Sequence, residues 1–258
     1  MTTSICDVHP DRIEVRGLDL CDELIGKIGF TAYFLLLLTG SNPSAKLVAA
    51  TDAALVAIGE HGLVPSVQTA RMTYAADPAA IQGAVSAGLL GCGSVILGAS
   101  QVAGELLIEV ATAARQSEAV DQAVLRILAR LKAEGKTVPG FGHSIHRDGD
   151  PRAARLLAVA EELGVSGDHC AAAKALERHV ATVTGRNLPM NVSAAIPAIL
   201  LDAGYPADSL KGIPLLARCA ALIAHLREES RTRLGFPLAE AAASRVRYEN
   251  AAVPSDGA

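Results

Sequence analysis

A run of fifteen residues in the middle of the chain limits the possible folds most, because it cannot continue a regular helix or strand. It extends from Pro139 to Ala153 and consists largely of glycine, proline, histidine, arginine and aspartate. The patterns on both sides are helical, up to Lys136 upstream and over residues 153–163 downstream. Glycine and proline interrupt helices, so the run is predicted to be a loop between two helices, where chemical groups are held on a rigid scaffold.

The end of this run presents two side chains that suit an anionic ligand. Asp150 followed by Pro151 is typical of a helix N-cap with proline at the first helical position. This places Arg152 at the start of a helix and near His143. An imidazole beside a fixed guanidinium suits an anionic substrate with an oxygen to polarise. A structural turn with solvated charges would explain one isolated histidine or arginine, but this density of polar residues favours a site.

The composition of the chain indicates a helical fold. Half of the 258 residues are hydrophobic, yet only 3% are aromatic and there is no tryptophan. The core must therefore be built from Ala, Leu, Val and Ile, which favours closely packed helices in an all-α protein of one large or two small domains. The predicted elements are an extended segment over residues 7–22 and helices over 21–38, 45–60, 78–91, 103–134, 153–163, 170–185 and 213–229.

Charge and cysteine content argue against several classes of protein. The net charge is −4 and no basic run stands out, so nucleic acid is not an expected partner. Five cysteines are scattered without metal-ligand spacing, which favours reduced thiols in a cytoplasmic protein without a metal site. The first ten residues lack an apolar signal core, and the longest apolar run, 30–38, is too short to span a bilayer. We therefore expect a cytoplasmic protein that is not in a membrane.

The central run also resembles the signature of the citrate synthase superfamily, which is roughly P-G-F-G-H-x-V-Y-K-x-x-D-P-R-A. The glycines, His143 and the Asp-Pro-Arg triplet agree in identity and spacing, while His146 stands where the family usually has Tyr. The resemblance extends over about residues 5 to 250. It implies a homodimer with a citrate synthase-like fold. A large helical domain would comprise residues 1–101 and 207–258, a smaller one 102–206, and the ligand would lie in the cleft between them.

Three more segments resemble family elements that bind substrate carboxylates. His61 lies in a corner similar to the family's "DHE/G…S…AR" element, whose histidine holds oxaloacetate or citrate. Arg218 is an internal charge in an apolar helix, which requires an anionic partner when buried. That helix resembles "AR-x-x-G-x-I-A-H-x-x-E", whose arginine binds a substrate carboxylate. Arg245 lies near the place of a carboxylate-binding arginine that the family supplies across the dimer. The resemblance thus implies that His61, Arg152, Arg218 and Arg245 bind substrate.

Two departures from the family pattern concern the acetyl half of the reaction. Ile96 stands where citrate synthases have a histidine that donates to the thioester oxygen. Citryl-CoA lyases and the lyase domain of ATP-citrate lyase also lack that histidine, so this departure favours the lyase branch. Ser193 stands after Asn191-Val192, where the family has an aspartate that moves a proton at the acetyl methyl. A hydroxyl is a poor base for a carbon acid, although the position remains a candidate catalytic one with His143.

The resemblance implies that coenzyme A enters as a thioester substrate and that no cofactor is permanently bound. Glycines allow a backbone to approach a ligand closely and to expose amide donors. Gly140 and Gly142 are therefore candidate coenzyme A contacts. Arg186 is a candidate partner for a phosphate of coenzyme A, and Asn191 is the fourth residue expected to contact the coenzyme.

Three hypotheses for function follow, in order of preference. The first is a citryl-CoA lyase-like enzyme in which His143 takes the hydroxyl proton while Arg152, Arg218 and His61 bind carboxylates. The second is a citrate synthase-like acyltransferase that condenses acetyl-CoA with another 2-oxoacid. The third is a non-catalytic relative that binds a carboxylate or an acyl-CoA as a sensor or partner subunit, because the proton-transfer groups are depleted.

Overall fold

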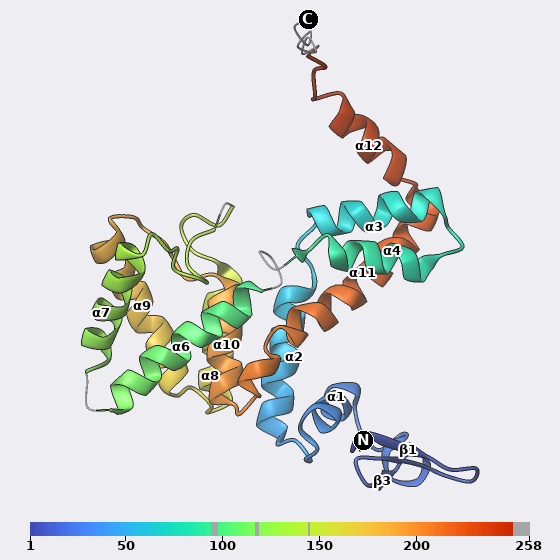
Figure 1. Cartoon of the computed structure of the whole chain (residues 1–258), viewed down its shortest axis with the longest axis horizontal. Coiled ribbons are helices and arrows are strands. Elements are labelled where there is room, and N and C mark those ends of the chain that lie inside the picture. Colours follow the sequence, from blue (N-terminus) through green and yellow to red (C-terminus); the bar gives the residue numbers. More distant parts are fainter. Residues whose placement is uncertain (94–97, 117–118, 144, 250–258) are drawn as a thin grey trace, which may run out of the picture. The chain divides into compact units, whose positions relative to one another are not determined.

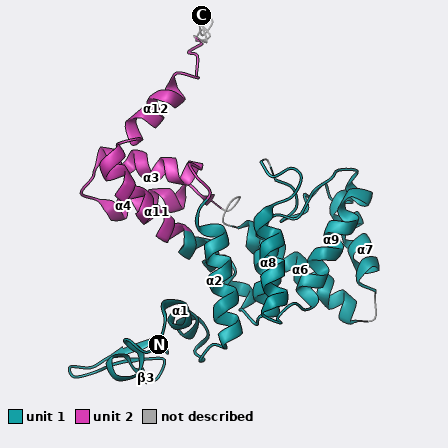
Figure 2. Cartoon of the chain, turned by 180° about the vertical axis from the view of Figure 1, so that it is seen from behind, with its two compact units in different colours: residues 1–60, 94–217 teal, residues 61–93, 218–258 magenta. Residues whose placement is uncertain are grey.

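The computed structural model describes residues 1–93, 98–116, 119–143 and 145–249, and it is mostly helical, as predicted. Ile96, one of the two departures above, lies outside the described residues. Contacts divide the chain into two units, residues 1–60 with 94–217 and residues 61–93 with 218–258, coloured teal and magenta in Figure 2. This grouping does not test the predicted domain division, which stays a prediction.

The first unit begins with a small antiparallel sheet, as the extended pattern predicted. Its strands are β1 (Cys6–Val8), β2 (Ile13–Val15) and β3 (Leu18–Asp19), in that order, with Cys6 opposite Val15 and Glu14 opposite Asp19. Arg16 and Gly17 form the two-residue turn between β2 and β3, with φ angles of 53° and 80°. The Arg16 side chain donates to the Leu37 carbonyl (Nε–O 3.1 Å), which fastens the hairpin to the following helix.

The predicted helix over 21–38 is interrupted, and this part of the prediction is wrong. A short π-helical turn, η1 (Leu20–Leu24), is capped by Asp19 and is followed by a break. The helix α1 (Phe30–Thr39) begins only after Gly29. The interruption contains Gly26 with φ of 76°, a conformation that side chains with a Cβ rarely adopt. The glycines at 26 and 29 therefore outweigh the apolar periodicity of the segment.

The helix α10 (Val192–Asp202) is the centre of the first unit (Figure 1). It is buried almost throughout and packs against four other helices. These are α2 (Ala45–Gly59), α6 (Ala99–Arg115), α8 (Pro151–Glu162) and α9 (Asp168–Thr184). Small residues allow this packing: a Cβ on Gly104 of α6 would lie 3.2 Å from the Pro197 Cβ of α10 and 2.3 Å from a methyl carbon of Leu210. The unit also contains the short 3-10 helix η2 (Ala207–Ser209).

The predicted helix over 103–134 is two helices, a second correction. The first is α6, and the second is α7 (Val120–Ala133), whose buried face includes Val124, Ile127 and Leu128. The two pack against each other, and Arg130 Nη2 on α7 donates to Glu109 Oε2 on α6 at 2.7 Å. The chain turns back because the apolar face of α7 is then buried against α6 and α9.

The second unit is a smaller helical group. It contains α3 (Pro65–Ala76), α4 (Ile81–Leu90), residues 218–232 of α11 (Gly212–Thr232) and α12 (Gly235–Ala243). The sequence did not predict the last of these, α12. Its core contains Val67, Ala70, Ala84, Leu222 and Leu226.

One helical stretch, Ala207–Thr232, is long and apolar enough to cross a membrane by length and composition alone. The core helix of a soluble protein passes the same test, so this stretch is weak evidence for a membrane-spanning segment.

Candidate functional site

The loop that carries His143 is fastened to the segment just before α10. The Gly142 amide donates to the Pro189 carbonyl (2.7 Å), and the Asn191 amide donates to the Gly140 carbonyl (2.9 Å). The Asn191 side chain adds a bond from Nδ2 to the Gly142 carbonyl at 2.7 Å. The buried residue Phe141 forms an isolated antiparallel β-bridge with Met190. The backbone leading to His143 is therefore held on both sides of Phe141, as catalysis by a positioned group requires.

Gly140 and Gly142 are explained by this close approach. Both have φ of 82°, where residues with a Cβ are strained. A Cβ on Gly140 would lie 2.5 Å from the Ala194 Cβ, and one on Gly142 would lie 3.0 Å from Leu188 Cδ2. The glycines thus let the loop meet α10 and its preceding segment. Their predicted contact with coenzyme A stays a prediction.

The His143 ring is held in one tautomer by the loop itself. Its Nδ1 accepts hydrogen bonds from the amides of Ile145 and His146, each at 3.1 Å, so Nδ1 cannot carry a proton. The pKa of His143 is lowered by burial and by the nearby charges of His146 and Arg152, against the opposing effect of Asp150. The neutral ring therefore carries its proton on Nε2, where it can be donated to an oxygen of a ligand.

Arg152 is held by Asp150, which is the N-cap of α8 as the sequence predicted. The Asp150 carboxylate accepts Arg152 Nε at 3.0 Å and Nη2 at 2.9 Å, in the two-bond geometry typical of arginine and carboxylate. It also accepts the backbone N–H of Val192 at 3.0 Å. Burial raises the pKa of Asp150, but these hydrogen bonds outweigh burial and the pKa is lowered, so the carboxyl group is ionised.

Ser193 and Asn191 lie at the start of α10, beside these bonds. Asn191 caps the helix, with its Oδ1 accepting the Ser193 amide at 2.9 Å. Ser193 is half-buried. The helix also contains Pro197, which has no N–H to donate to the Ser193 carbonyl four residues earlier. The structure therefore brings Asn191 and Ser193 next to the Asp150–Val192 bond, and their predicted roles stay predictions.

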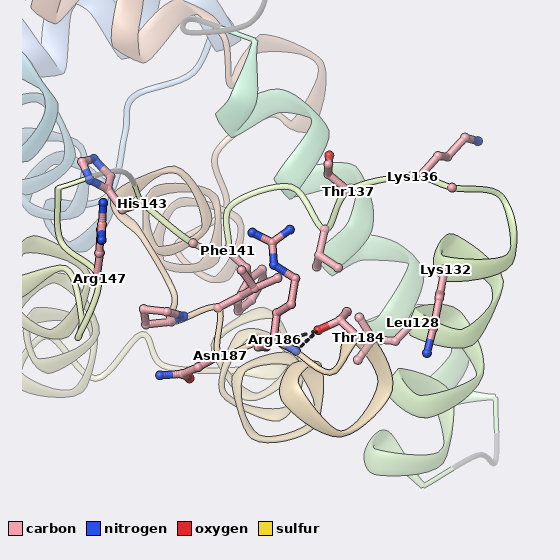
Figure 3. Close-up of a pocket in the computed structure, with 15 residues that line it drawn as sticks. Leu128, Lys132, Lys136, Thr137, Phe141, His143, Arg147, Thr184, Arg186 and Asn187 are labelled. Carbon is pink, nitrogen blue, oxygen red and sulfur yellow. Dashed lines mark hydrogen bonds between the residues drawn. The ribbon is translucent and has the colours of Figure 1, made fainter.

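A pocket of about 870 Å³ lies beside the loop. Figure 3 shows His143 and Arg147 on one side, Lys132 and Lys136 on the other, and Arg186 between them. None of the described residues that line it is an aspartate or glutamate. Apolar side chains complete the wall: Leu128, Val138, Phe141, Leu188 and Pro189. A pocket with several cations, an apolar wall and no carboxylate is suited to a phosphorylated ligand with an uncharged portion.

The sequence predicted two of the five basic residues that line this pocket and missed three. His143 and Arg186 were candidates, and the structure brings both to it. Lys132, Lys136 and Arg147 were not among the candidates. Lys132 is positioned by a bond from Nζ to the Val183 carbonyl at 2.7 Å. The signal that was available is that two lysines come just before the glycine-rich run and an arginine lies inside it.

The other predicted residues belong to the second unit. His61 is half-buried between α2 and α3, in the predicted corner. Arg218 is 6% exposed, as expected for an internal charge, and its Nη1 is buried without a hydrogen-bond partner among the described residues. Arg245 is exposed after the end of α12. The expectation that His61, Arg218, His143 and Arg152 surround one ligand stays a prediction.

Other family-like residues of the second unit form a buried ion network. Arg71 is 1% exposed, and its Nη1 lies 3.0 Å from Glu229 Oε2. Its Nη2 bonds to Glu228 and lies 2.9 Å from His225 Nδ1. Glu229 Oε1 accepts the amide of Gly235 at the start of α12 (2.7 Å). The "AR" and "AH-x-x-E" fragments of the sequence are therefore joined inside this unit, where they connect α3, α11 and α12.

The family model "Citrate synthase, C-terminal domain" matches residues 13–237. Putative citrate synthase 2 of Mycobacterium tuberculosis is 31% identical over 234 residues, which cover 87% of this chain and 57% of that protein. Citrate synthase 2 of Bacillus subtilis is 27% identical over 202 residues, covering 78% and 52%. The chain thus spans about half the length of these curated relatives.

Two solved structures are similar over nearly the whole chain. The citryl-CoA lyase of Hydrogenobacter thermophilus has a TM-score of 0.86 and 28% identity, with 99% of this chain and 96% of that chain covered. ATP citrate lyase of Methanothrix soehngenii, solved with citrate and coenzyme A, has a TM-score of 0.79 and 23% identity, with 99% and 42% covered. The second likeness concerns the fold alone. Together they confirm the predicted citrate synthase-like fold.

Proposed function

Because the chain belongs to the citrate synthase family, we propose that it makes or breaks the carbon–carbon bond between the acetyl group of a coenzyme A thioester and a 2-oxoacid, as a citryl-CoA lyase-like enzyme. The observation that carries the proposal is the pocket beside the His143 loop, which is lined by cationic side chains and by no aspartate or glutamate among the described residues. The similarity to a citryl-CoA lyase over 99% of this chain supports the lyase direction.

The pocket suits the coenzyme A portion of such a substrate. Coenzyme A carries several phosphate charges and a long arm, and Lys132, Lys136, Arg147 and Arg186 offer charge-assisted hydrogen bonds to phosphate oxygens. The apolar wall suits the uncharged parts of the same molecule. We assign Arg186 a phosphate contact, as the sequence suggested, and extend this role to the other three residues. We assign the thioester end of the coenzyme, with the reacting carbon, to the side of the pocket that His143 lines.

The carboxylates of the substrate are assigned to arginine and histidine side chains. Arg152 is fixed in orientation by Asp150, so it binds a carboxylate without first being ordered. Arg218 has a buried Nη1 with hydrogen-bonding capacity left over, which a substrate carboxylate would satisfy. We keep His61 and Arg245 in this set on the strength of the family resemblance.

In the cleavage direction, the bond between the hydroxyl-bearing carbon and the acetyl methylene breaks. The hydroxyl loses its proton and becomes the keto group of the 2-oxoacid, and the departing enolate takes a proton to give acetyl-CoA. His143 as the base for the hydroxyl requires its other tautomer, because Nδ1 accepts two amide hydrogen bonds. In the tautomer with its proton on Nε2, His143 instead donates a hydrogen bond to the substrate oxygen. This bond stabilises the negative charge that develops on that oxygen in both cleavage and condensation.

Proton transfer at the acetyl group distinguishes the lyase proposal from two alternatives, condensation with another 2-oxoacid and binding without turnover. The group at position 193 is a hydroxyl, whereas a matched base is the usual means of moving a proton at carbon. Condensation with another 2-oxoacid requires that proton transfer from the stable acetyl-CoA methyl, so this second candidate is less favoured. Binding without turnover is the third candidate, supported by carboxylate-binding groups that remain while the proton-transfer group is absent.

Incubation with synthetic citryl-CoA tests the proposal, with acetyl-CoA and oxaloacetate followed by mass spectrometry. We expect both products from the natural protein and a loss of turnover in Arg152→Ala. Ser193→Asp is expected to raise cleavage by up to about 10²–10⁴-fold if proton delivery limits the rate. A natural protein that binds coenzyme A and citrate but stays inactive, even with Ser193→Asp, is instead the binding relative. A protein that binds neither contradicts the proposal.

A further inference from the structure

Asp150 connects three parts of the site described above, although the sequence pattern indicated only a helix cap at this position. We propose that Asp150 is a positioning residue that holds the Arg152 guanidinium, the His143 loop and the start of α10 in one fixed arrangement for a carboxylate substrate. The substrate class rests on the proposed function, whereas the arrangement itself is a property of the free protein.

The first observation is that the Asp150 carboxylate is buried and fully used. Its side chain is 0% exposed. Oδ1 accepts the backbone N–H and the Nε–H of Arg152, both at 3.0 Å, and Oδ2 accepts Nη2 of Arg152 at 2.9 Å and the Val192 amide at 3.0 Å. A helix cap alone needs only the bond to a backbone amide. Two of the remaining three bonds hold the Arg152 guanidinium, and the third holds the backbone amide of Val192 at the start of α10.

The second observation is the orientation that these bonds impose on Arg152. Its Nε and one hydrogen of Nη2 are directed at Asp150, so the edge formed by Nη1 and the other Nη2 hydrogen is left for a ligand. The side chain is 19% exposed, so this edge can be reached from outside. Since the plane of a guanidinium sets the direction of its hydrogen bonds, Asp150 determines where a bidentate carboxylate can sit.

The third observation concerns the ends of the His143 loop. Gly142, just before His143, is bonded to the Asn191 side chain, and Asp150, at the end of the loop, is bonded to the Val192 amide. Asn191 and Val192 are the cap and the first residue of α10. Both ends of the loop over residues 143–149 are therefore fastened to the same helical turn. Removing the Asp150 carboxylate would release one end and alter the position of His143.

The electrostatics agree with this arrangement. Asp150 is the nearby group that raises the pKa of His143, against the lowering effects of burial, His146 and Arg152. Neutralising Asp150 should therefore lower the pKa of His143 further. The titration of His143 therefore reports whether the Asp150 charge lies close to the ring.

The variants Asp150→Asn, Arg152→Ala and their combination test the proposal, with citrate as the probe in calorimetry. Asp202→Asn is the matched control, because Asp202 is also a buried carboxylate of this unit, accepts the backbone amides of Gly167 and Cys170, and does not line the pocket. We expect Asp150→Asn to weaken citrate binding by about tenfold or more, and Asp202→Asn to leave it unchanged. In the Arg152→Ala background, Asp150→Asn should cost much less affinity than it does alone, because the part of its effect that acts through Arg152 is already lost. Unchanged binding in Asp150→Asn, or a full additional loss in the double variant, would overturn the proposal.

A measurement without ligand separates this inference from the proposed function. In ¹⁵N NMR of the natural protein, the Arg152 Nε–H should exchange slowly with solvent, and in Asp150→Asn the pKa of His143 should fall. Rapid exchange of Arg152 Nε–H in the natural protein overturns the inference even where Asp150→Asn does not fold. A natural protein that fails to bind citrate contradicts the proposed function, while these two signals still test Asp150.

Discussion

Arg71 in the second unit and Arg186 in the first both belong to segments that the sequence connects with the family, but among the described residues carboxylates match only the charge of Arg71. Arg71 is buried and bonded to Glu228 and Glu229, and Glu229 also holds the start of α12. Arg186 is exposed and lines a pocket with three other cations and no described acid. Charges paired in a buried network stabilise one arrangement of helices, whereas cations that line a pocket can be reached by a ligand.

The largest expected effect is on the matched region. Glu229→Ala leaves Arg71 buried with only the exposed Glu228 as its carboxylate partner, which should lower the free energy of unfolding by about 3–5 kcal/mol. Glu228→Ala is the matched control: its side chain is 56% exposed, so we expect a loss of about 1 kcal/mol or less. Urea unfolding of the two variants checks this, and equal losses would show that burial of the pair does not decide its contribution.

The next effect concerns the backbone of the pocket loop. Gly140→Ala should cost about 2–5 kcal/mol, from the left-handed backbone and from contact with the backbone and Cβ of Ala194. Gly185→Ala has a similar φ of 73° but nothing within 4 Å of the new Cβ, so about 1–2 kcal/mol is expected. Thermal unfolding of both variants measures the difference. A loss in Gly140→Ala no greater than in the control would mean that close approach to α10 is not required.

The sequence revealed the elements of the site that depend on local chemistry. The helix cap at Asp150, the position of Arg152 and the burial of Arg218 all follow from neighbouring residues, and the structure agrees with each. The helix breaks near Gly26 and before Val120 were missed, because apolar periodicity continues across them.

The basic residues of the pocket could not be found in the same way. Lys132 and Arg186 are far apart in the sequence and meet only because α7 and α9 pack together. A lysine on the polar face of a helix has the same local pattern whether it borders solvent or a pocket. The dual role of Asp150 was missed for a related reason, since its bond to Val192 joins segments that only the fold brings together.

A smaller effect is expected for Asp202 of the first unit, a carboxylate whose charge is matched by hydrogen-bond donors. Burial raises the pKa of Asp202, but the hydrogen bonds from His169 and from the amides of Cys170 and His169 outweigh burial and lower it to about 2, below the ordinary 3.8. Its contribution to stability is therefore present above about pH 4 and is lost as the pH falls towards 2, and amounts to about 2 kcal/mol. Unfolding between pH 2 and 6 should show this slope, and Asp202→Asn should reduce it. An unchanged slope in that variant would assign the pH dependence to other groups.

Calorimetric titration with coenzyme A tests the central claim most directly, namely that the cations lining the pocket beside the His143 loop bind the coenzyme. We expect the natural protein to bind, with an affinity that falls as salt is raised, and Lys132→Gln with Arg186→Gln to weaken binding by about tenfold or more. Glu228→Gln, which changes an exposed charge of the other network, should bind as the natural protein does. Coenzyme A binding that is undetectable, or that is unaffected by loss of Lys132 and Arg186, would contradict the account.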